Sequence, residues 1–205
     1  MNKYDVIIIG AGPSGIFCAY ELMRQKPDMK VLMIEKGRSI EKRQCPKRTT
    51  KVCVGCKPCS ITTGFAGAGA FSDGKLSLSP DVGGTLPEIL GYEKAEELIK
   101  EADNIYLKFG ADEKVYGIDD YEAIERIRAK AIRANLKLIE CPIRHLGTEE
   151  GYKIYTRLQE HLLASGVEIK FMTMVQDIII EDGVAKGSLQ TKRKLTMRMK
   201  SYQVS

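Results

Sequence analysis

The sequence predicts an α/β fold with a parallel sheet, and two patterns near its start carry that prediction. Residues 4–9, "YDVIII", and 30–35, "KVLMIE", are short runs of mostly β-branched and other aliphatic side chains. Such runs are typical of strands that are buried on both faces of a parallel sheet. Between them, apolar residues recur at helical spacing from Ile16 to Met23 and predict an amphipathic helix over 13–26. Strand, helix and strand together form a βαβ unit.

Composition fits a globular protein with a sizeable core. The chain has 205 residues, of which 43% are apolar and 29% are charged. No apolar run approaches the roughly 20 residues of a membrane span, and the run at 6–9 is too short for a signal-peptide core. We therefore expect a cytoplasmic location and no membrane partner.

The net charge of +5 comes from the C-terminal residues rather than from the whole chain. Residues 191–205 contain five basic side chains and no acidic one, which leaves 27 basic and 27 acidic residues in the rest of the chain. A short basic tail on a balanced body is most simply a solvated tail. A nucleic-acid partner is therefore not expected.

The segment "GAGPSG", residues 10–15, follows the first predicted strand and opens the predicted helix. In this pattern Gly10 allows a tight turn, Gly12 lets the backbone approach a pyrophosphate, and Gly15 lets helix and strand pack closely. Pro13 suits the first helical turn, where free N–H groups and the helix dipole face the phosphates. Glu35 lies 20 residues after Gly15, where an acid binds a ribose diol and disfavours the 2′-phosphate of NADP.

This fingerprint alone leaves FAD and NAD open as the dinucleotide. A simple NAD domain would continue with regular βα units. Here Glu35 is followed by "KGRSIEKRQ" and then by a long segment rich in cysteine and glycine. That interruption favours FAD and a three-layer, Rossmann-like fold with an insertion.

Several stretches together resemble the uncharacterised bacterial FAD-dependent dehydrogenases, NAD(P)/FAD-dependent oxidoreductases with two domains. The stretches are "DVIIIGAGPSGIFCAYEL", "VLMIEKG", "CVGCKPC", "GFAGAGAFSDGKLSL" and "RHLGTEEGYKIYTRLQEHL", within residues 4–188. The resemblance implies hydride transfer to or from flavin N5. It also implies a small-molecule substrate or an electron donor such as NAD(P)H.

The resemblance also places residues around FAD. The "GPSG" turn, with Gly12, Pro13, Ser14 and Gly15, would lie on the pyrophosphate together with Gly10. Glu35 would bind the adenosine ribose, Lys36 would lie beside the adenosine, and the backbone around Val175 would lie against the adenine.

Four cysteines lie in one basic loop: Cys45, Cys53, Cys56 and Cys59. Three interpretations are open. The C-x2-C-x2-C spacing matches the start of a ferredoxin cluster run, with Thr63 in place of the fourth cysteine, so an iron–sulfur cluster is favoured over zinc. A C-x-x-C dithiol that exchanges electrons with a flavin is the second interpretation, and structural thiols are the third.

The remaining chain predicts further elements. Residues 87–109 and 119–135 predict charged helices, 136–140 and 167–172 predict strands, and 148–166 predicts a helix. A hairpin is expected to turn at Asp182 and Gly183. Lys75, at the end of the glycine-rich loop 64–75, and His145 are candidates for chemistry beside a flavin, whereas His161 is expected to be structural or solvent-facing.

These elements predict five segments. Residues 1–44 and 148–190 would form two parts of an FAD-binding domain, 45–86 a Cys/Gly-rich loop, 87–147 a helical insertion and 191–205 a disordered tail. Because the resembling proteins are about twice as long, we expect a truncated form. An exposed edge on the first strand would then favour self-association. The alternative function is a metal- or nucleotide-binding module without turnover.

Overall fold

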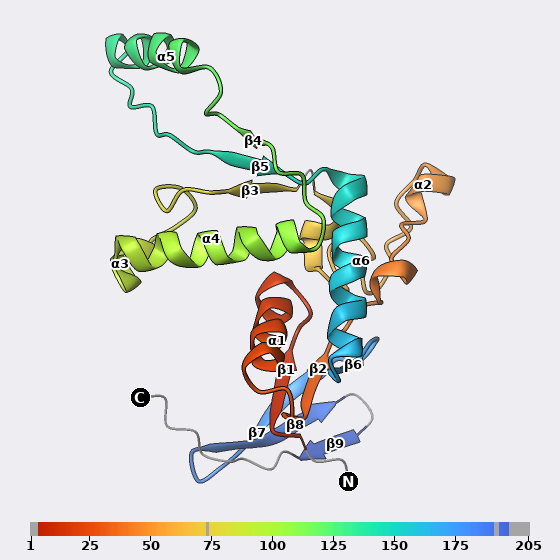
Figure 1. Cartoon of the computed structure of the whole chain (residues 1–205). Coiled ribbons are helices and arrows are strands. Elements are labelled where there is room, and N and C mark those ends of the chain that lie inside the picture. Colours follow the sequence, from red (N-terminus) through yellow and green to blue (C-terminus); the bar gives the residue numbers. More distant parts are fainter. Residues whose placement is uncertain (1–3, 73, 191–192, 197–205) are drawn as a thin grey trace. The chain divides into compact units, whose positions relative to one another are not determined.

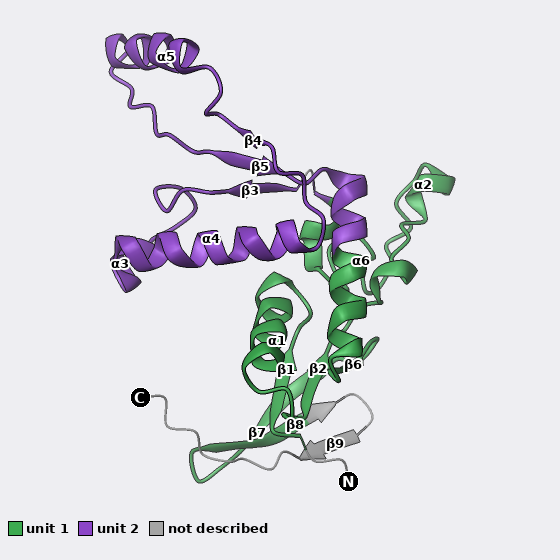
Figure 2. Ribbon diagram, in the orientation of Figure 1, with its two compact units in different colours: residues 1–71, 155–205 green, residues 72–154 purple. Residues whose placement is uncertain are grey.

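The computed structural model describes residues 4–72, 74–190 and 193–196 (Figure 1). The chain forms two compact units, which are coloured separately in Figure 2. Unit 1 comprises residues 1–71 and 155–205, and unit 2 comprises residues 72–154. Within the described residues, no helix combines the length and the apolar character that crossing a bilayer requires.

Unit 1 is built on a parallel sheet of three strands, as the sequence predicts. β1 (Val6–Ile9), β2 (Val31–Ile34) and β6 (Glu168–Lys170) lie in the order β1-β2-β6 (Figure 1). β2 is the central strand, and every residue of it is buried. α1 (Pro13–Gln25) connects β1 to β2, and α6 (Thr148–Ala164) precedes β6.

The two faces of this sheet are covered differently. Ile8 faces α1, since its side chain lies beside Gly15. Ile7 points to the opposite face and packs with Val175 against a core of Tyr4, Leu32 and Ile34. Val175 begins β7 (Val175–Glu181), which forms an antiparallel sheet with β8 (Val184–Gln190) and β9 (Arg193–Thr196). Unit 1 therefore has helix, parallel sheet and antiparallel sheet as its layers.

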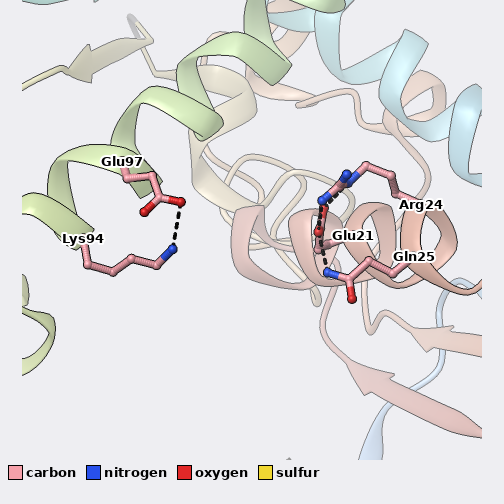
Figure 3. A network of polar contacts seen from close by, with 5 residues as sticks. All are labelled: Glu21, Arg24, Gln25, Lys94 and Glu97. Carbon is pink, nitrogen blue, oxygen red and sulfur yellow. Dashed lines mark hydrogen bonds and ion pairs between the residues drawn. The ribbon is translucent and has the colours of Figure 1, made fainter. Parts of the chain in front are cut away.

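α1 also packs against α6. The ring of Tyr20 lies 5.4 Å from that of His161. The opposite side of α1 is exposed, where Glu21 accepts hydrogen bonds from Arg24 and Gln25 (Figure 3). These bonds lower the pKa of Glu21 to about 2.

Unit 2 contains an antiparallel sheet. β3 (Lys75–Ser77), β5 (Ile143–His145) and β4 (Val115–Tyr116) lie in the order β3-β5-β4. The helices are α3 (Leu86–Leu90), α4 (Tyr92–Lys108) and α5 (Tyr121–Arg133). Arg144 of β5 reaches α4 and donates to both carboxylate oxygens of Asp103, at 2.5 and 2.8 Å, and to the carbonyl of Asp112 at 2.6 Å.

Two predictions about elements need correction. The helix predicted over 87–109 is interrupted at Gly91, whose φ of +82° ends α3 before α4 begins. The strand predicted over 136–140 is wrong: Leu136 and Ile139 are exposed, and the strand of this region is β5. An apolar alternation without a neighbouring strand to bond does not form a strand.

The predicted disordered tail, residues 191–205, lies mostly outside the described residues and stays a prediction. Residues 193–196 form β9, paired with β8, whereas residues 191–192 and 197–205 lie outside the described residues. The hairpin prediction is confirmed, since Asp182 and Gly183 both have positive φ between β7 and β8. The segment boundaries predicted for the domains stay predictions.

The buried ion pair of unit 2 supplies a stability test. We predict that Asp103→Asn lowers the free energy of unfolding of unit 2 by about 3–5 kcal/mol, because it leaves the Arg144 guanidinium buried without its counter-charge. Lys94→Ala, on the same helix, breaks the exposed pair with Glu97 (Figure 3) and should cost less than about 1 kcal/mol. Chemical denaturation of both variants checks this, and equal losses would contradict it.

Candidate nucleotide-binding site

Four backbone segments of unit 1 meet at the carboxyl ends of the parallel strands. Ala66 N, in the glycine-rich loop, donates to Ala11 O in the segment after β1, at 2.7 Å. Phe65 N, in the same loop, donates to Arg38 O in the segment after β2, at 3.0 Å. The segment after β6 joins them, because Met172 N donates to Gly37 O at 2.8 Å. This edge is where open α/β sheets bind their ligands.

The three positions of the first turn are occupied by glycine for different structural reasons. Gly10 has a φ of +97°, which other residues adopt only with strain. A Cβ on Gly15 would lie 2.1 Å from Gly10 O, so no side chain fits there. A Cβ on Gly12 would meet no described atom within 4 Å, and its φ of −74° suits any residue. Backbone conformation explains Gly10 and packing explains Gly15, but neither explains Gly12.

Gly12 is also the N-cap of α1, and it has no side chain with which to cap the helix. The first N–H groups of a helix have no acceptor within the helix. Those of Ser14 and Gly15 therefore lie beside the open space at Gly12, with Pro13 at the first helical position. This arrangement suits an anion.

Glu35 lies at the end of β2 and is only 5% exposed. Its carboxylate oxygens accept from Ala11 N at 2.8 Å and from Gly37 N at 2.7 Å. Glu35 therefore fixes the first turn to the segment after β2. Because each carboxylate oxygen can accept a second hydrogen bond, the group retains capacity for ribose hydroxyls. Lys36 is exposed beside it, and Val175 contributes its side chain to the core.

The glycine-rich loop packs backbone to backbone on this site. A Cβ on Gly37 would lie 2.5 Å from Gly64 N, and one on Gly64 would lie 2.7 Å from Arg38 O. A short 3-10 helix, η2 (Gly67–Phe71), follows, and its first residue lies against Gly12. The glycine-rich loop therefore contacts the first turn through its backbone.

Arg43 is the residue that the sequence analysis missed. It is 3% exposed and donates to four backbone carbonyls: Ser60 (3.0 Å), Ile61 (2.5 Å), Phe65 (2.5 Å) and Gly67 (2.6 Å). Its guanidinium also lies 4.7 Å from the centre of the Phe71 ring. Burial lowers the pKa of Arg43, and the charges of Glu35 and Cys59 oppose that shift. One side chain thus binds the end of the cysteine loop to the glycine-rich loop.

Arg43 is itself positioned by the turn before it, η1 (Ile40–Lys42). Gln159 of α6 accepts from Ile40 N at 3.0 Å and donates to Glu41 at 3.0 Å. No sequence pattern distinguishes Arg43 from its neighbours Lys42 and Arg48, because its role depends on contacts between distant segments.

The predicted metal site is not supported. Cys45, Cys53, Cys56 and Cys59 are all free thiols, and the described residues contain no group of three side chains placed to bind a metal. The thiols are spread along a loop that contains α2 (Lys47–Thr50), with Cys53 and Cys59 exposed. Sequence spacing alone therefore does not make them converge.

Lys75 and His145 belong to unit 2, where they are direct partners across β3 and β5. Both are exposed, and the ring of Tyr116 lies 6.4 Å from the His145 ring. No sequence pattern indicates that these residues are neighbours. Their roles beside a flavin stay predictions.

Known proteins resemble this chain at two levels, in the first βαβ unit and in the fold as a whole. The Thi4 family matches residues 1–41, which contain the first βαβ unit. A thiamine thiazole synthase of Coprinopsis cinerea is 52% identical over 33 residues, which are 16% of this chain and 10% of that protein.

Solved structures match almost the whole chain at low identity. They include glycine oxidase from Bacillus cereus (18% identity, TM-score 0.53) and L-amino acid deaminase from Proteus vulgaris (12%, 0.54). A third is 3-ketosteroid-Δ4-(5α)-dehydrogenase from Rhodococcus jostii (17%, 0.55). They cover 96%, 97% and 96% of this chain, which spans 56%, 47% and 44% of theirs. The chain therefore has an α/β fold of the Rossmann-like FAD/NAD(P)-binding type and spans about half the length of these proteins.

The Arg43 contacts supply a second test. We predict that Arg43→Lys lowers the free energy of unfolding of unit 1 by about 3 kcal/mol or more, because a lysine cannot reach four carbonyls and buried acceptors are left unpaired. Arg48→Lys is the matched control, since Arg48 is exposed in the same segment. Thermal and denaturant unfolding measure the effect, and an R43K variant as stable as R48K would contradict it.

Proposed function

We propose that the protein is an FAD-dependent oxidoreductase whose unit 1 binds the ADP half of FAD. The observation that carries the proposal is Gly12: its missing side chain leaves open the space at the N-terminus of α1, and no packing among the described residues requires it. A pyrophosphate that approaches the backbone there explains the glycine.

The other residues fit the same ligand. The N–H groups of Ser14 and Gly15 would donate to the pyrophosphate, and the remaining lone pairs of Glu35 would accept from the adenosine ribose. The glycine-rich loop, fixed by Arg43, would exclude water from one side of the dinucleotide. When bound, FAD supplies a two-electron acceptor that takes a hydride.

FAD is preferred to NAD because the glycine-rich loop, rather than a further regular βα unit, follows β2 and packs on the first turn. The names of the matched structures, an oxidase, a deaminase and a dehydrogenase, agree with redox chemistry on this fold. The finer proposal is a cytoplasmic flavoprotein like the uncharacterised bacterial dehydrogenases, which acts on a small molecule or takes electrons from a donor such as NAD(P)H.

The ligand proposal is tested at Gly12. We predict that Gly12→Ala leaves the melting temperature unchanged but weakens FAD binding about tenfold or more, equivalent to about 1.4 kcal/mol, because the methyl group occupies the pyrophosphate position. Flavin fluorescence titration measures the affinity.

Gly151→Ala is the matched control. A Cβ on Gly151 would also meet no described atom within 4 Å, but this glycine lies in α6 rather than in the first turn. Gly15→Ala should instead destabilise the fold through its clash with Gly10 O. FAD affinity that is equal in G12A, G151A and the wild type would contradict the proposal.

We also propose that the chain self-associates through the outer edge of β1. Val6 N donates to Lys30 O, just before β2, and Gly10 N donates to Ile34 O of β2. By alternation the backbone groups of Ile7 and Ile9 therefore point away from β2. β1 is an edge strand among the described strands, and Ile9 is 51% exposed. Such an edge pairs readily with a second copy.

Sedimentation velocity over a range of concentrations tests this proposal. We predict concentration-dependent association that Ile9→Lys weakens and Leu163→Lys, at an equally exposed position on α6, leaves unchanged. A wild-type protein that stays monomeric throughout would contradict it.

A further inference from the structure

The antiparallel sheet of unit 2 (Figure 1) has one buried face and one open face. On the buried face, Arg144 of β5 is 4% exposed and donates to Asp103. Its partners across the sheet are Leu76 of β3 and Val115 of β4. Because side chains alternate along a strand, the residues next to these three lie on the other face.

That other face, which we call the open face, presents basic and polar side chains from all three strands. Its strand residues are Lys75, Ser77, Ile143, His145 and Tyr116, of which none is acidic. Lys75, His145 and Tyr116 are exposed, and the other two are half-buried. The open face is therefore positively charged and partly apolar.

The register of the sheet holds Lys75 and His145 close together. Leu146 N donates to Gly74 O at 2.7 Å, so the next pair along the strands, Lys75 and His145, is a non-hydrogen-bonded pair. Side chains lie closest in pairs of this kind. Two basic groups placed opposite each other destabilise a sheet when both are charged. The stability of the sheet therefore does not explain this pairing, whereas an anion bound between the two side chains does.

Aromatic contacts extend the row to β4. The ring of Tyr116 lies 6.4 Å from the His145 ring, at an interplanar angle of 83°. Lys114 Nζ lies 4.7 Å from the centre of the Tyr116 ring and adds a second ammonium group. Tyr116 is nevertheless 46% exposed, so part of its apolar surface is open to a ligand.

The acidic residues before β4 act on the buried face. Hydrogen bonding to Asp103 raises the pKa of Arg144, burial opposes that shift, and the charges of Asp103, Asp112 and Glu113 add to it. The Asp112 carbonyl also accepts from Arg144 at 2.6 Å. The Asp112 carboxylate accepts from the backbone N–H of Lys114, at 2.9 Å. These acids therefore balance the charge of Arg144 on the buried face.

We propose that the open face binds a small organic carboxylate. The carboxylate group lies between the Lys75 ammonium and the His145 imidazole, where a charged donor gives a strong hydrogen bond. The apolar body of the ligand lies on the Tyr116 ring and Ile143. Inorganic phosphate does not use this apolar surface. The inference concerns unit 2 alone and does not rest on FAD binding by unit 1.

NMR of the backbone amides of the full chain, titrated with benzoate, tests the proposal. Benzoate should shift the amides of Ser77, Ile143 and His145, with a Kd of about 1–10 mM, as expected for a ligand of this size. Benzamide, which has the same ring and no charge, should bind about tenfold more weakly or less. Acetate or inorganic phosphate that binds as tightly as benzoate would indicate an adventitious ion only and overturn the proposal. Benzoate shifts confined to other parts of the chain would also overturn it.

Two substitutions test the charged and the apolar parts of the site separately. Lys75→Met should raise the Kd for benzoate about fivefold or more, whereas Lys100→Met, at an exposed lysine of α4, should leave it unchanged. Tyr116→Leu should also weaken benzoate, whereas Tyr92→Leu, at a tyrosine of α4 that is 49% exposed, should not. Equal affinities in K75M and K100M, or in Y116L and Y92L, overturn the proposal. FAD titration of the same samples distinguishes failure of this site from failure of the FAD site.

Discussion

The guanidinium of Arg43 is the interaction on which the carboxyl edge of unit 1 depends. It is a buried cation whose hydrogen bonds go to backbone carbonyls from two stretches, 60–61 and 65–67. Loops rarely bury their carbonyls, because each needs a partner away from water. Arg43 supplies hydrogen-bond donors to several carbonyls at once, through a planar guanidinium that no other side chain reproduces. The glycine-rich loop can therefore pack against the first turn without losing its hydrogen bonds.

Glu35 has the corresponding role with the opposite charge. It accepts from N–H groups of the segments after β1 and β2, while Arg43 donates to carbonyls of the loops that cover them. Two buried charges are thus solvated mainly by backbone dipoles rather than by a direct ion pair. The result is a rim, made of the first turn, the segment after β2 and the glycine-rich loop, that is fixed before a ligand binds. A preformed rim reduces the entropy cost of ordering these segments on binding. Gly12 and the first N–H groups of α1 are the part of that rim left open.

The sequence predicts the parts of this fold that local patterns determine. The βαβ unit, the glycine turn, the position of Glu35 and the hairpin at Asp182 follow from periodicity, spacing and turn chemistry within short windows. Arg43 could not be found in this way, since its partners lie 17 to 24 residues further along the chain. The pairing of Lys75 with His145 and the failure of the strand at 136–140 have the same cause: neighbours distant in the sequence decide them. The cysteine spacing suggested a metal, but spacing does not specify how a loop folds.

The claim that this rim is a preformed FAD site is tested most directly by hydrogen exchange with mass spectrometry, with and without FAD. The account predicts slower exchange on FAD addition in two separate stretches, residues 12–16 of the first turn and residues 64–68 of the glycine-rich loop, with β7 and β8 little changed. FAD that binds without protecting either stretch, or that protects only unit 2, would contradict the account.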